Sequence, residues 1–226
     1  MKRHPSTGDR RRHAPAAAMT VAMVTAAGLT VASAASLPVG ARQLSVDARS
    51  ETVPLTTCSG QPAADTFTDQ AIPATNNGTG AELRVASRTG AVKRAFLRFD
   101  LAGCSIPPDA VVRSAELSLY LWSAPSAART YGAFRLTSAW DETTLTWASA
   151  QPSAVGSATA TVTTGTAGTV RWDVTTDVQA HVRTPSSSHG WVLRDLTETG
   201  GSTREAGFVS REYGTAPPSL EITYYP

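Results

Sequence analysis

Short runs of alternating hydrophobic and polar residues, separated by Gly, Pro, Ser and Thr, fill the chain from about residue 63 to its end. This period of two is typical of β-strands with one face on a core and the other in solvent. We therefore expect antiparallel strands throughout this part of the chain. The segments are ELRVAS, RAFLRFDL, SAELSLYLW, GAFRL, TTLTW, ATATVTT, TVRWDV, GWVLRD, GFVSRE and LEITYY, with RQLSVDA as a further candidate upstream.

One segment, WDVTTDVQAHV, has the period of a helix instead. Its valines recur at every fourth position, at Val174, Val178 and Val182. Thr175 or Thr176 can cap the first turn, and Asp177 suits the positive end of a helix. Asn76-Asn77-Gly78 predicts a turn, because Asn and Gly tolerate a positive φ. About ten strands and one short helix, without strand–helix alternation, predict an all-β fold, an antiparallel β-sandwich of jelly-roll type.

The charge of the chain is unevenly distributed. The formal total is +2, but residues 1–13 carry five Lys or Arg and one Asp, so the remaining residues sum to −2. An uncharged stretch follows and contains the small-residue site Ala32-Ser33-Ala34. These features predict a cleavable signal peptide over residues 1–35, with a retained signal-anchor as the alternative. Without residues 1–35 the protein is slightly acidic, which removes the argument for nucleic acid as a partner.

The rest of the chain is expected to be a secreted protein without a permanent membrane span. Residues 36–62 are expected to form an extension or linker, and residues 63–226 the β-sandwich. The only cysteines are Cys58 and Cys104, and an exported chain meets oxidising conditions, so a disulfide is expected to tether the extension to the domain. Two free thiols or a catalytic cysteine are the rival interpretation, which neither a nearby His nor a CxxC spacing supports.

Seven segments, in order, resemble one known family. They are ADTFTDQAIPATNNGTGAELRV, RAFLRFDL, IPPDAVVRSAELSLYL, AWDETTLTW, WDVTTDVQAHV, GWVLRD and FVSREYGTAPPSLEITY. Over residues 63–226 the chain resembles the DNRLRE (disaggregatase-related) domain, which is grouped with carbohydrate-binding module family 96. The resemblance implies a secreted β-sandwich of a kind that often accompanies polysaccharide-degrading enzymes, and alginate binding is known for some members.

Two aromatic residues share one face of an expected strand. In SAELSLYLW the leucines at 117, 119 and 121 share one face, so Tyr120 and Trp122 point the other way. If the leucines face the core, these two rings form an exposed ledge on which the C–H face of a sugar can pack. The alternative, which is the commoner one for large aromatics, is that a loop or a second sheet edge covers them. The other tryptophans, at 140, 147, 172 and 191, are expected in the core.

The same parity argument predicts a basic strip. Arg84 in ELRVAS and Arg94, Phe96 and Arg98 in RAFLRFDL alternate with apolar residues and should point outward beside Lys93. Arginine pairs bidentately with carboxylates, so this strip could bind a polysaccharide that contains uronate. The commoner outcome is a solvated face, neutralised by nearby acids. The expected acids are Glu82, Asp100 and Glu116.

Other chemistry receives less support from the sequence. Hard oxygen donors for a structural calcium ion are present at Asp65, Asp69, Asp173 and Asp177, although aspartates near turns more often cap backbone amides. No other cofactor is expected. Beyond the leader only two histidines remain, His181 and His189, and no hydrolase or metalloprotease motif is found. The pair Asp141-Glu142 would point to opposite faces of a strand, so it does not resemble a glycosidase pair.

We therefore expect a monomeric, secreted, non-catalytic carbohydrate-binding module. Its partner would be an extracellular polysaccharide, with an acidic, alginate-like polymer as one candidate. A structural or adhesive protein of the cell surface or matrix that lacks a sugar site is the alternative. A small polysaccharide lyase or hydrolase is the third hypothesis.

Overall fold

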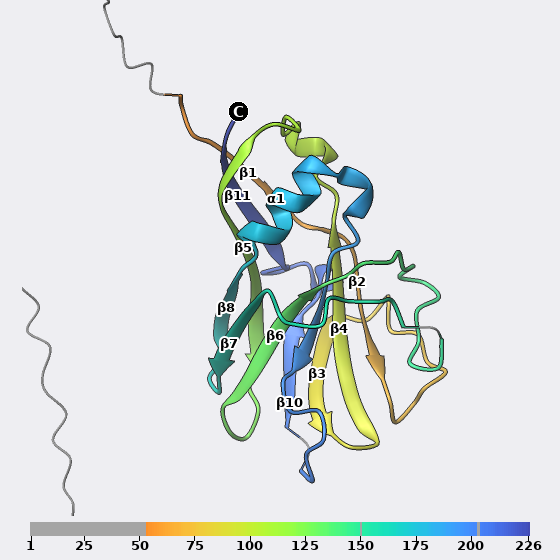
Figure 1. The fold of residues 1–226 in the computed structure, drawn as a ribbon. Coiled ribbons are helices and arrows are strands. Elements are labelled where there is room, and N and C mark those ends of the chain that lie inside the picture. Colours follow the sequence, from red (N-terminus) through yellow and green to blue (C-terminus); the bar gives the residue numbers. More distant parts are fainter. Residues whose placement is uncertain (1–52, 150, 203) are drawn as a thin grey trace, which may run out of the picture. The chain divides into compact units, whose positions relative to one another are not determined.

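The structure, a computed structural model, describes residues 53–149, 151–202 and 204–226 (Figure 1). The predicted signal peptide and the RQLSVDA strand lie outside these residues. The strands are β1 (Thr56–Gly60), β2 (Pro62–Asp69), β3 (Glu82–Arg88), β4 (Ala91–Phe99), β5 (Val111–Ser123), β6 (Arg129–Arg135), β7 (Ala160–Thr164), β8 (Gly168–Asp173), β9 (Trp191–Asp195), β10 (Glu205–Val209) and β11 (Ser219–Tyr225). The helix is α1 (Thr175–Arg183), with 3₁₀ turns η1 (Ala102–Cys104), η2 (Pro185–Ser187) and η3 (Arg211–Tyr213).

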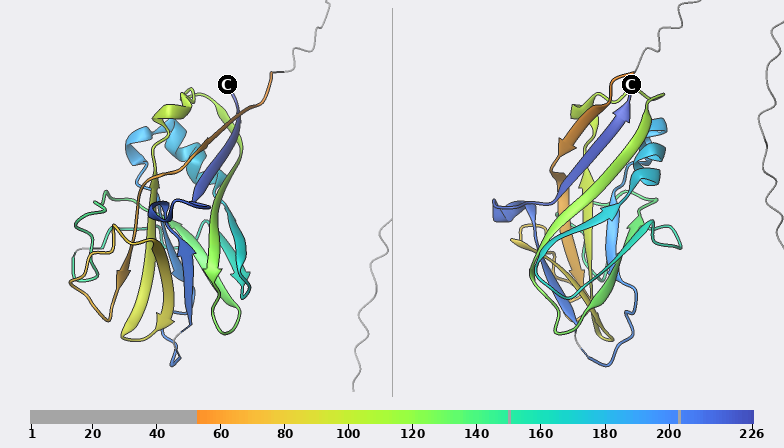
Figure 2. Two further views of the ribbon diagram at one scale, coloured as in Figure 1. Left: turned by 180° about the vertical axis from the view of Figure 1, so that it is seen from behind. Right: turned by 90° about the vertical axis from the view of Figure 1, so that its left-hand side faces the viewer.

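The strands pair antiparallel in the order β1-β11-β5-β10-β3-β4-β9-β6-β7, with β8 on the other edge of β5 and β2 on the other edge of β4. The long strands β5 and β4 change partners along their length. β11 pairs with β5 up to Ser118, and β10 pairs with its end. β3 pairs with the start of β4, and β9 with its middle. The sheet thus folds over on itself, and the predicted jelly-roll type of β-sandwich is confirmed (Figures 1 and 2).

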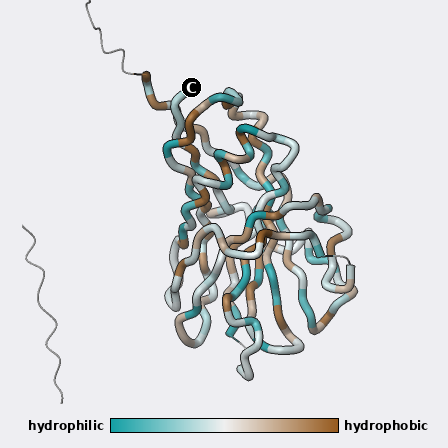
Figure 3. Tube along the Cα trace, in the orientation of Figure 1, coloured by the Kyte–Doolittle hydropathy of each residue, from teal (hydrophilic) through white to brown (hydrophobic). Residues whose placement is uncertain are grey.

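The core lies between the two layers and follows the predicted alternation. On β5, Leu117, Leu119 and Leu121 are at most 1% exposed, while the residues between them point outward. Figure 3 shows this alternation of apolar and polar positions along the strands. The largest fully buried side chains are Trp172 and Trp191. The Trp172 indole donates a hydrogen bond to the carbonyl of Tyr131 at 3.0 Å, so its polar atom has a partner inside the core.

The strand prediction for TTLTW is wrong, because residues 142–144 form a turn and the residues that follow it do not form a strand. The cause is Asp141, whose Oδ1 accepts hydrogen bonds from the amide and the hydroxyl of Thr143 at 2.9 and 2.6 Å. Such a short-range bond gives the backbone an alternative to a sheet ladder. Conversely, β1 and β2 are strands that the alternation pattern did not indicate. β2 is polar in sequence yet buried along nearly its whole length.

The predicted helix forms, with its apolar face at Val178 and Val182 in the core. The predicted threonine caps are wrong. The N-cap is Val174, and Thr175 instead accepts a hydrogen bond from the amide of Ala115 on β5 at 2.9 Å. This bond holds the start of α1 against β5, where Figures 1 and 2 show the helix. Among the described residues, no helix is long and apolar enough to cross a membrane.

The disulfide prediction is confirmed. Cys58 on β1 and Cys104 in η1 are bonded, with their Cα atoms 5.7 Å apart. The bond joins strands that are distant in the order of the sheet, because β1 pairs with β11 while η1 follows β4. A loop of this length, 46 residues, stabilises the fold by about 4 kcal/mol in the chain-entropy model.

Candidate functional site

Tyr120 and Trp122 both point outward from β5. Tyr120 is 40% exposed and Trp122 is 49% exposed, as the parity of the buried leucines requires. Among the described residues, no loop or second sheet edge buries these two rings. Large aromatic side chains are usually buried, so two exposed rings on alternate positions of one strand form an uncommon surface.

A glycine extends this surface across the neighbouring strands. Gly207 on β10 pairs with Ser123 on β5 and with Arg84 on β3. A Cβ atom at position 207 would lie 3.1 Å from the indole Nε1 of Trp122, so the absence of a side chain leaves room for this ring. The Trp122 ring therefore lies against the buried Gly207 on β10, and Arg84 is the residue paired with Gly207 on β3. We call Tyr120, Trp122, Gly207 and Arg84 the aromatic face.

The arginine at the end of the aromatic face is ion-paired. Arg84 contacts Glu82 at 2.8 Å and Glu205 at 2.9 Å, and Glu205 also binds Lys93 at 2.7 Å. The network continues to Asp69, 3.5 Å from Lys93. The predicted basic strip is therefore neutralised here, by Glu82 as expected but also by a glutamate from β10.

The rest of the predicted strip does not form one surface. Arg94 pairs bidentately with Glu198 at 2.7 and 2.8 Å, and its guanidinium lies 5.0 Å from the ring centre of Trp147. The expected acids Asp100 and Glu116 are wrong as partners: Glu116 pairs with Arg171 on β8 instead, and among the described residues Asp100 makes no ion pair.

The prediction that Phe96 points into solvent is wrong. Phe96 does point away from the main core, but it is only 1% exposed. The long connection between β6 and β7 folds over it and forms a small second core. Trp140 belongs to this cluster, with its ring 5.9 Å from that of Phe96. Parity gives the face of a strand, and it cannot say whether a connection covers that face.

A network of acids and one arginine lies where the 70–81 and 136–159 connections run on the same side of the molecule in both views (Figures 1 and 2). Arg211 binds Glu142 at 2.6 Å and Glu212 at 2.7 Å. The Arg211 amide donates to Asp65 at 3.0 Å, and the Asp65 amide donates to Glu142 at 2.8 Å. We call these four residues the Arg211 network. Three of the segments that carry the family resemblance meet in it.

Asn76 and Gly78 lock the 70–81 connection onto the Arg211 network. The side chain of Asn76 donates to the carbonyls of Glu142 and Leu145 at 2.7 and 2.9 Å. A side chain at Gly78 would collide with the Glu142 carbonyl. The turn forms, yet neither asparagine nor Gly78 has a positive φ, so the predicted reason is wrong. Gly78 is needed for a close approach instead.

The four calcium candidates lie in separate networks. Asp65 belongs to the Arg211 network and Asp69 contacts Lys93. Asp173 accepts hydrogen bonds from Thr175. Asp177 accepts from the Trp191 indole at 2.8 Å and lies 3.4 Å from Arg135. Carboxylate oxygens of Asp65, Glu142 and Glu212 do lie within 4.8 Å of one another, but Arg211 supplies the positive charge among them.

Burial raises the pKa of Asp65 from 3.8 to about 7, while the hydrogen bond from the Arg211 amide lowers it and the nearby Glu212 raises it. The side chain is 1% exposed, and Oδ1 has no hydrogen-bond partner among the described residues. A raised carboxyl pKa is a feature of acid catalysts. Here the group is sealed from solvent by the described residues, so it offers a substrate no access.

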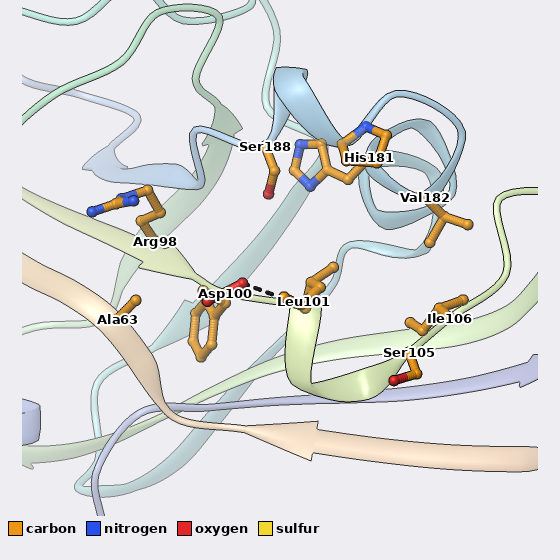
Figure 4. Close-up of a pocket in the computed structure, with 12 residues that line it drawn as sticks. Ala63, Arg98, Asp100, Leu101, Ser105, Ile106, His181, Val182 and Ser188 are labelled. Carbon is orange, nitrogen blue, oxygen red and sulfur yellow. Dashed lines mark hydrogen bonds between the residues drawn. The ribbon is translucent and has the colours of Figure 1, made fainter.

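A cavity of about 420 Å³ opens near α1 (Figure 4). Its walls come from β2, from the end of β4 and the residues after it, from η1 and the residues after it, and from the end of α1 with η2 and the residue that follows. His181 lines it and is 2% exposed, with its ring 5.5 Å from that of Trp191. Arg98 and Ser188 also line it. We call it the His181 cavity. The predictions placed Arg98 on a basic strip and gave no role to His181.

The remaining tryptophans mostly follow the prediction. Trp172 and Trp191 are in the main core, and Trp140 packs in the small core beside Phe96. Trp147 differs, because it is partly exposed beneath the guanidinium of Arg94.

The model of carbohydrate-binding module family 96 matches residues 56–224. The chain belongs to this family. The match spans every strand from β1 to β11, so the family-96 domain includes the disulfide, the aromatic face, the Arg211 network and the His181 cavity. No curated protein matches the chain. Membership makes the protein a carbohydrate-binding module, and the ligand has to be argued from the surfaces described above.

Proposed function

We propose that this family-96 module is secreted, is not an enzyme, and binds an extracellular polysaccharide through the aromatic face. The exposed pair Tyr120 and Trp122 is the observation that carries the proposal. The C–H face of a pyranose packs on an aromatic ring, and two rings two residues apart on a strand are about 6–7 Å from each other, which suits consecutive contacts along a sugar chain. Gly207 leaves room for the Trp122 ring to lie against the neighbouring strand.

The ion pairs bear on the charge of the ligand. An acidic, alginate-like polymer would have to compete with Glu82 and Glu205 for Arg84, while a neutral glycan would not. We therefore expect neutral polysaccharides to bind the aromatic face at least as tightly as alginate does. Alginate stays a candidate ligand, with Arg84 as the group on the aromatic face that its carboxylates would bind.

Affinity electrophoresis tests the proposal directly. Gels containing alginate, pectin, xylan, a soluble cellulose derivative or a soluble chitin derivative should retard the protein in at least one case. Tyr120→Ala with Trp122→Ala should abolish that retardation. Tyr213→Ala is the matched control, because Tyr213 is 59% exposed but lies in η3, away from β5. No retardation by any polymer, or an equal loss in the control, would overturn the proposal.

The structural or adhesive alternative has one observation in its favour. Phe96 is buried, and Arg84 and Arg94 are paired with acids, as expected for a fold without a sugar site. Exposure of Tyr120 and Trp122 argues for binding. For the third hypothesis, the same polymers should yield no products when incubated with the protein, and released oligosaccharides would show that the module is an enzyme.

A further inference from the structure

The His181 cavity lies at the opposite end of β5 from the aromatic face. Ile106, which follows η1, lines the cavity, and β5 begins five residues later at Val111. Trp122 is eleven residues further along the strand, a distance of about 35 Å at the rise of a β-strand. A sugar residue in the cavity would therefore not touch Trp122.

Two polar groups that line the cavity lack partners among the described residues. Both ring nitrogens of His181 have no hydrogen bond, although the residue is almost fully buried. The Nε atom of Arg98 is likewise buried and without a partner. A buried polar atom without a hydrogen bond destabilises a fold by about 1–3 kcal/mol, and such atoms are rare in native proteins. Both residues line one cavity, and because these three atoms have almost no exposed area of their own, a ligand supplies the missing bonds once the two side chains rotate toward it.

The polar groups of the cavity fit hydroxyls. Arg98 only donates hydrogen bonds and the carboxylate of Asp100 only accepts them, whereas Ser188 does both. Burial lowers the pKa of His181 to about 4, so its neutral ring donates at one nitrogen and accepts at the other. A hydroxyl also donates and accepts, so a ring with several hydroxyls can satisfy all four groups. A carboxylate could serve only the donors, and it would face Asp100.

The apolar part of the lining fits the same ligand. Phe99, Leu101 and Val182 also line the cavity. Figure 4 shows Arg98 and Asp100 coming from the end of β4 and the residue after it, and His181 and Ser188 coming from α1 and from the residue after η2. A pyranose has an apolar C–H face as well as its hydroxyls. The volume of about 420 Å³ falls within the range of small-molecule sites, about 300–1,000 Å³.

We propose that the His181 cavity is a second saccharide site, which takes a single pyranose residue and makes the module bivalent. The proposal rests on the proposed function in that the ligand is a sugar, but it uses none of the residues of the aromatic face. Two sites at opposite ends of β5 allow one molecule to hold two polysaccharide chains together, or two parts of one chain, with the gain in avidity that linked sites give.

Nuclear magnetic resonance of the His181 ring tests the proposal, because this ring lies in the cavity and far from Trp122. The probes are the methyl glycosides of glucose, galactose, mannose, xylose and N-acetylglucosamine, with glucuronate as the charged probe. We expect at least one neutral probe to shift the His181 ring signals in a saturable way. Arg98→Gln should weaken that binding about tenfold, the loss expected for a charged hydrogen-bond donor.

The controls separate this site from the aromatic face. Arg183→Gln removes an equal charge at the exposed end of α1 and should leave the binding unchanged. Ser188→Ala is a second test should Arg98→Gln fail to fold. Tyr120→Ala with Trp122→Ala should keep the His181 shifts while losing polysaccharide retardation.

Each outcome decides between the two proposals. If no probe shifts the His181 signals, or if Arg98→Gln and Ser188→Ala both bind like the wild type, the second site is wrong. Polysaccharide retardation can persist in that case, and the proposed function then stands alone. If glucuronate shifts the signals and no neutral probe does, the cavity binds an anion, and the assignment of a neutral pyranose is wrong.

Discussion

The Arg211 network and the His181 cavity differ in how many hydrogen bonds their buried polar groups make. In the network, the guanidinium of Arg211 binds two carboxylates, and the amides of Asp65 and Arg211 bind carboxylate oxygens as well. In the cavity, neither nitrogen of His181 has a partner within the part of the chain that the structure describes. The network is satisfied except at Oδ1 of Asp65, and such a polar cluster stabilises one arrangement of the chain. Unpartnered groups that line an open cavity are instead candidates for binding a ligand.

We expect this difference to distinguish the residues that stabilise this family-96 module from the residues that bind a ligand. The Arg211 network joins β2, the 136–159 connection and η3, which are far apart in sequence. Loss of this network should therefore lower the free energy of unfolding. In the proposed second site, the unpartnered groups of His181 and Arg98 gain hydrogen bonds from the ligand. Replacing these residues should therefore weaken binding and change the free energy of unfolding little.

The largest expected effect comes from the disulfide, which anchors the cavity and not the network. Cys104 lies in η1, between the cavity residues Ala102 and Ser105. Cys58→Ser with Cys104→Ser should lower the free energy of unfolding by about 4 kcal/mol. Hydrogen exchange should show faster exchange at the Cys104 amide, while the Arg211 amide keeps its protection. Equal loss of protection at both amides would show that the two regions unfold as one unit.

A smaller loss is expected from Arg211→Gln, which breaks the network. Glu142 and Glu212 lose their cation and stay near Asp65, so unfolding should become easier by about 2 kcal/mol, less than for a fully buried pair because Arg211 is partly exposed. Urea unfolding measures this change. Arg171→Gln is the matched control, since its pair with Glu116 is about half exposed and should contribute about 0.5 kcal/mol or less. Similar losses in both variants would mean that the network is an ordinary surface pair.

Replacing His181 should change stability least. His181→Phe exchanges a ring without hydrogen bonds for an apolar ring against Trp191, so the free energy of unfolding should stay within about 1 kcal/mol of the wild type. Thermal and urea unfolding measure it. A loss as large as that of Arg211→Gln would show that His181 has a partner in the folded protein, and the contrast between the two regions would fail.

The sequence predicted the strands in which buried and exposed residues alternate. It did not predict which outward-facing residues the connections between strands would bury. On β5 the parity of three leucines gives the direction of Tyr120 and Trp122. The same argument fails for Phe96, because the 136–159 connection is not periodic and nothing local says where it lies. β2 is missed for the related reason that its polar Thr and Asp residues are buried beneath connections.

The candidate sites show the same limit. Glu205 and Glu198 neutralise Arg84 and Arg94 from more than a hundred residues away along the chain, so spacing could not reveal them. His181 carried a weak signal, as a histidine in a helix with an apolar face beside Val178 and Val182. Only the fold brings it to a cavity with Arg98.

Stability against pH sharpens the comparison, because the two regions should respond with opposite signs. Folding raises the pKa of Asp65 to about 7, so the folded protein binds more protons than the unfolded chain between about pH 4 and 7, and stability falls as pH rises through that window. Folding lowers the pKa of His181 to about 4, so there the unfolded chain binds more protons, and stability rises between about pH 4 and 6.5.

Asp65→Asn should remove the falling contribution and His181→Phe the rising one. Urea unfolding across this range should therefore give a more positive slope of stability against pH in the first variant and a more negative slope in the second. Asp109→Asn, at an exposed position, is the control for the loss of one carboxyl. If both variants change the slope in the same direction, one of the two groups does not titrate as its surroundings in the fold require.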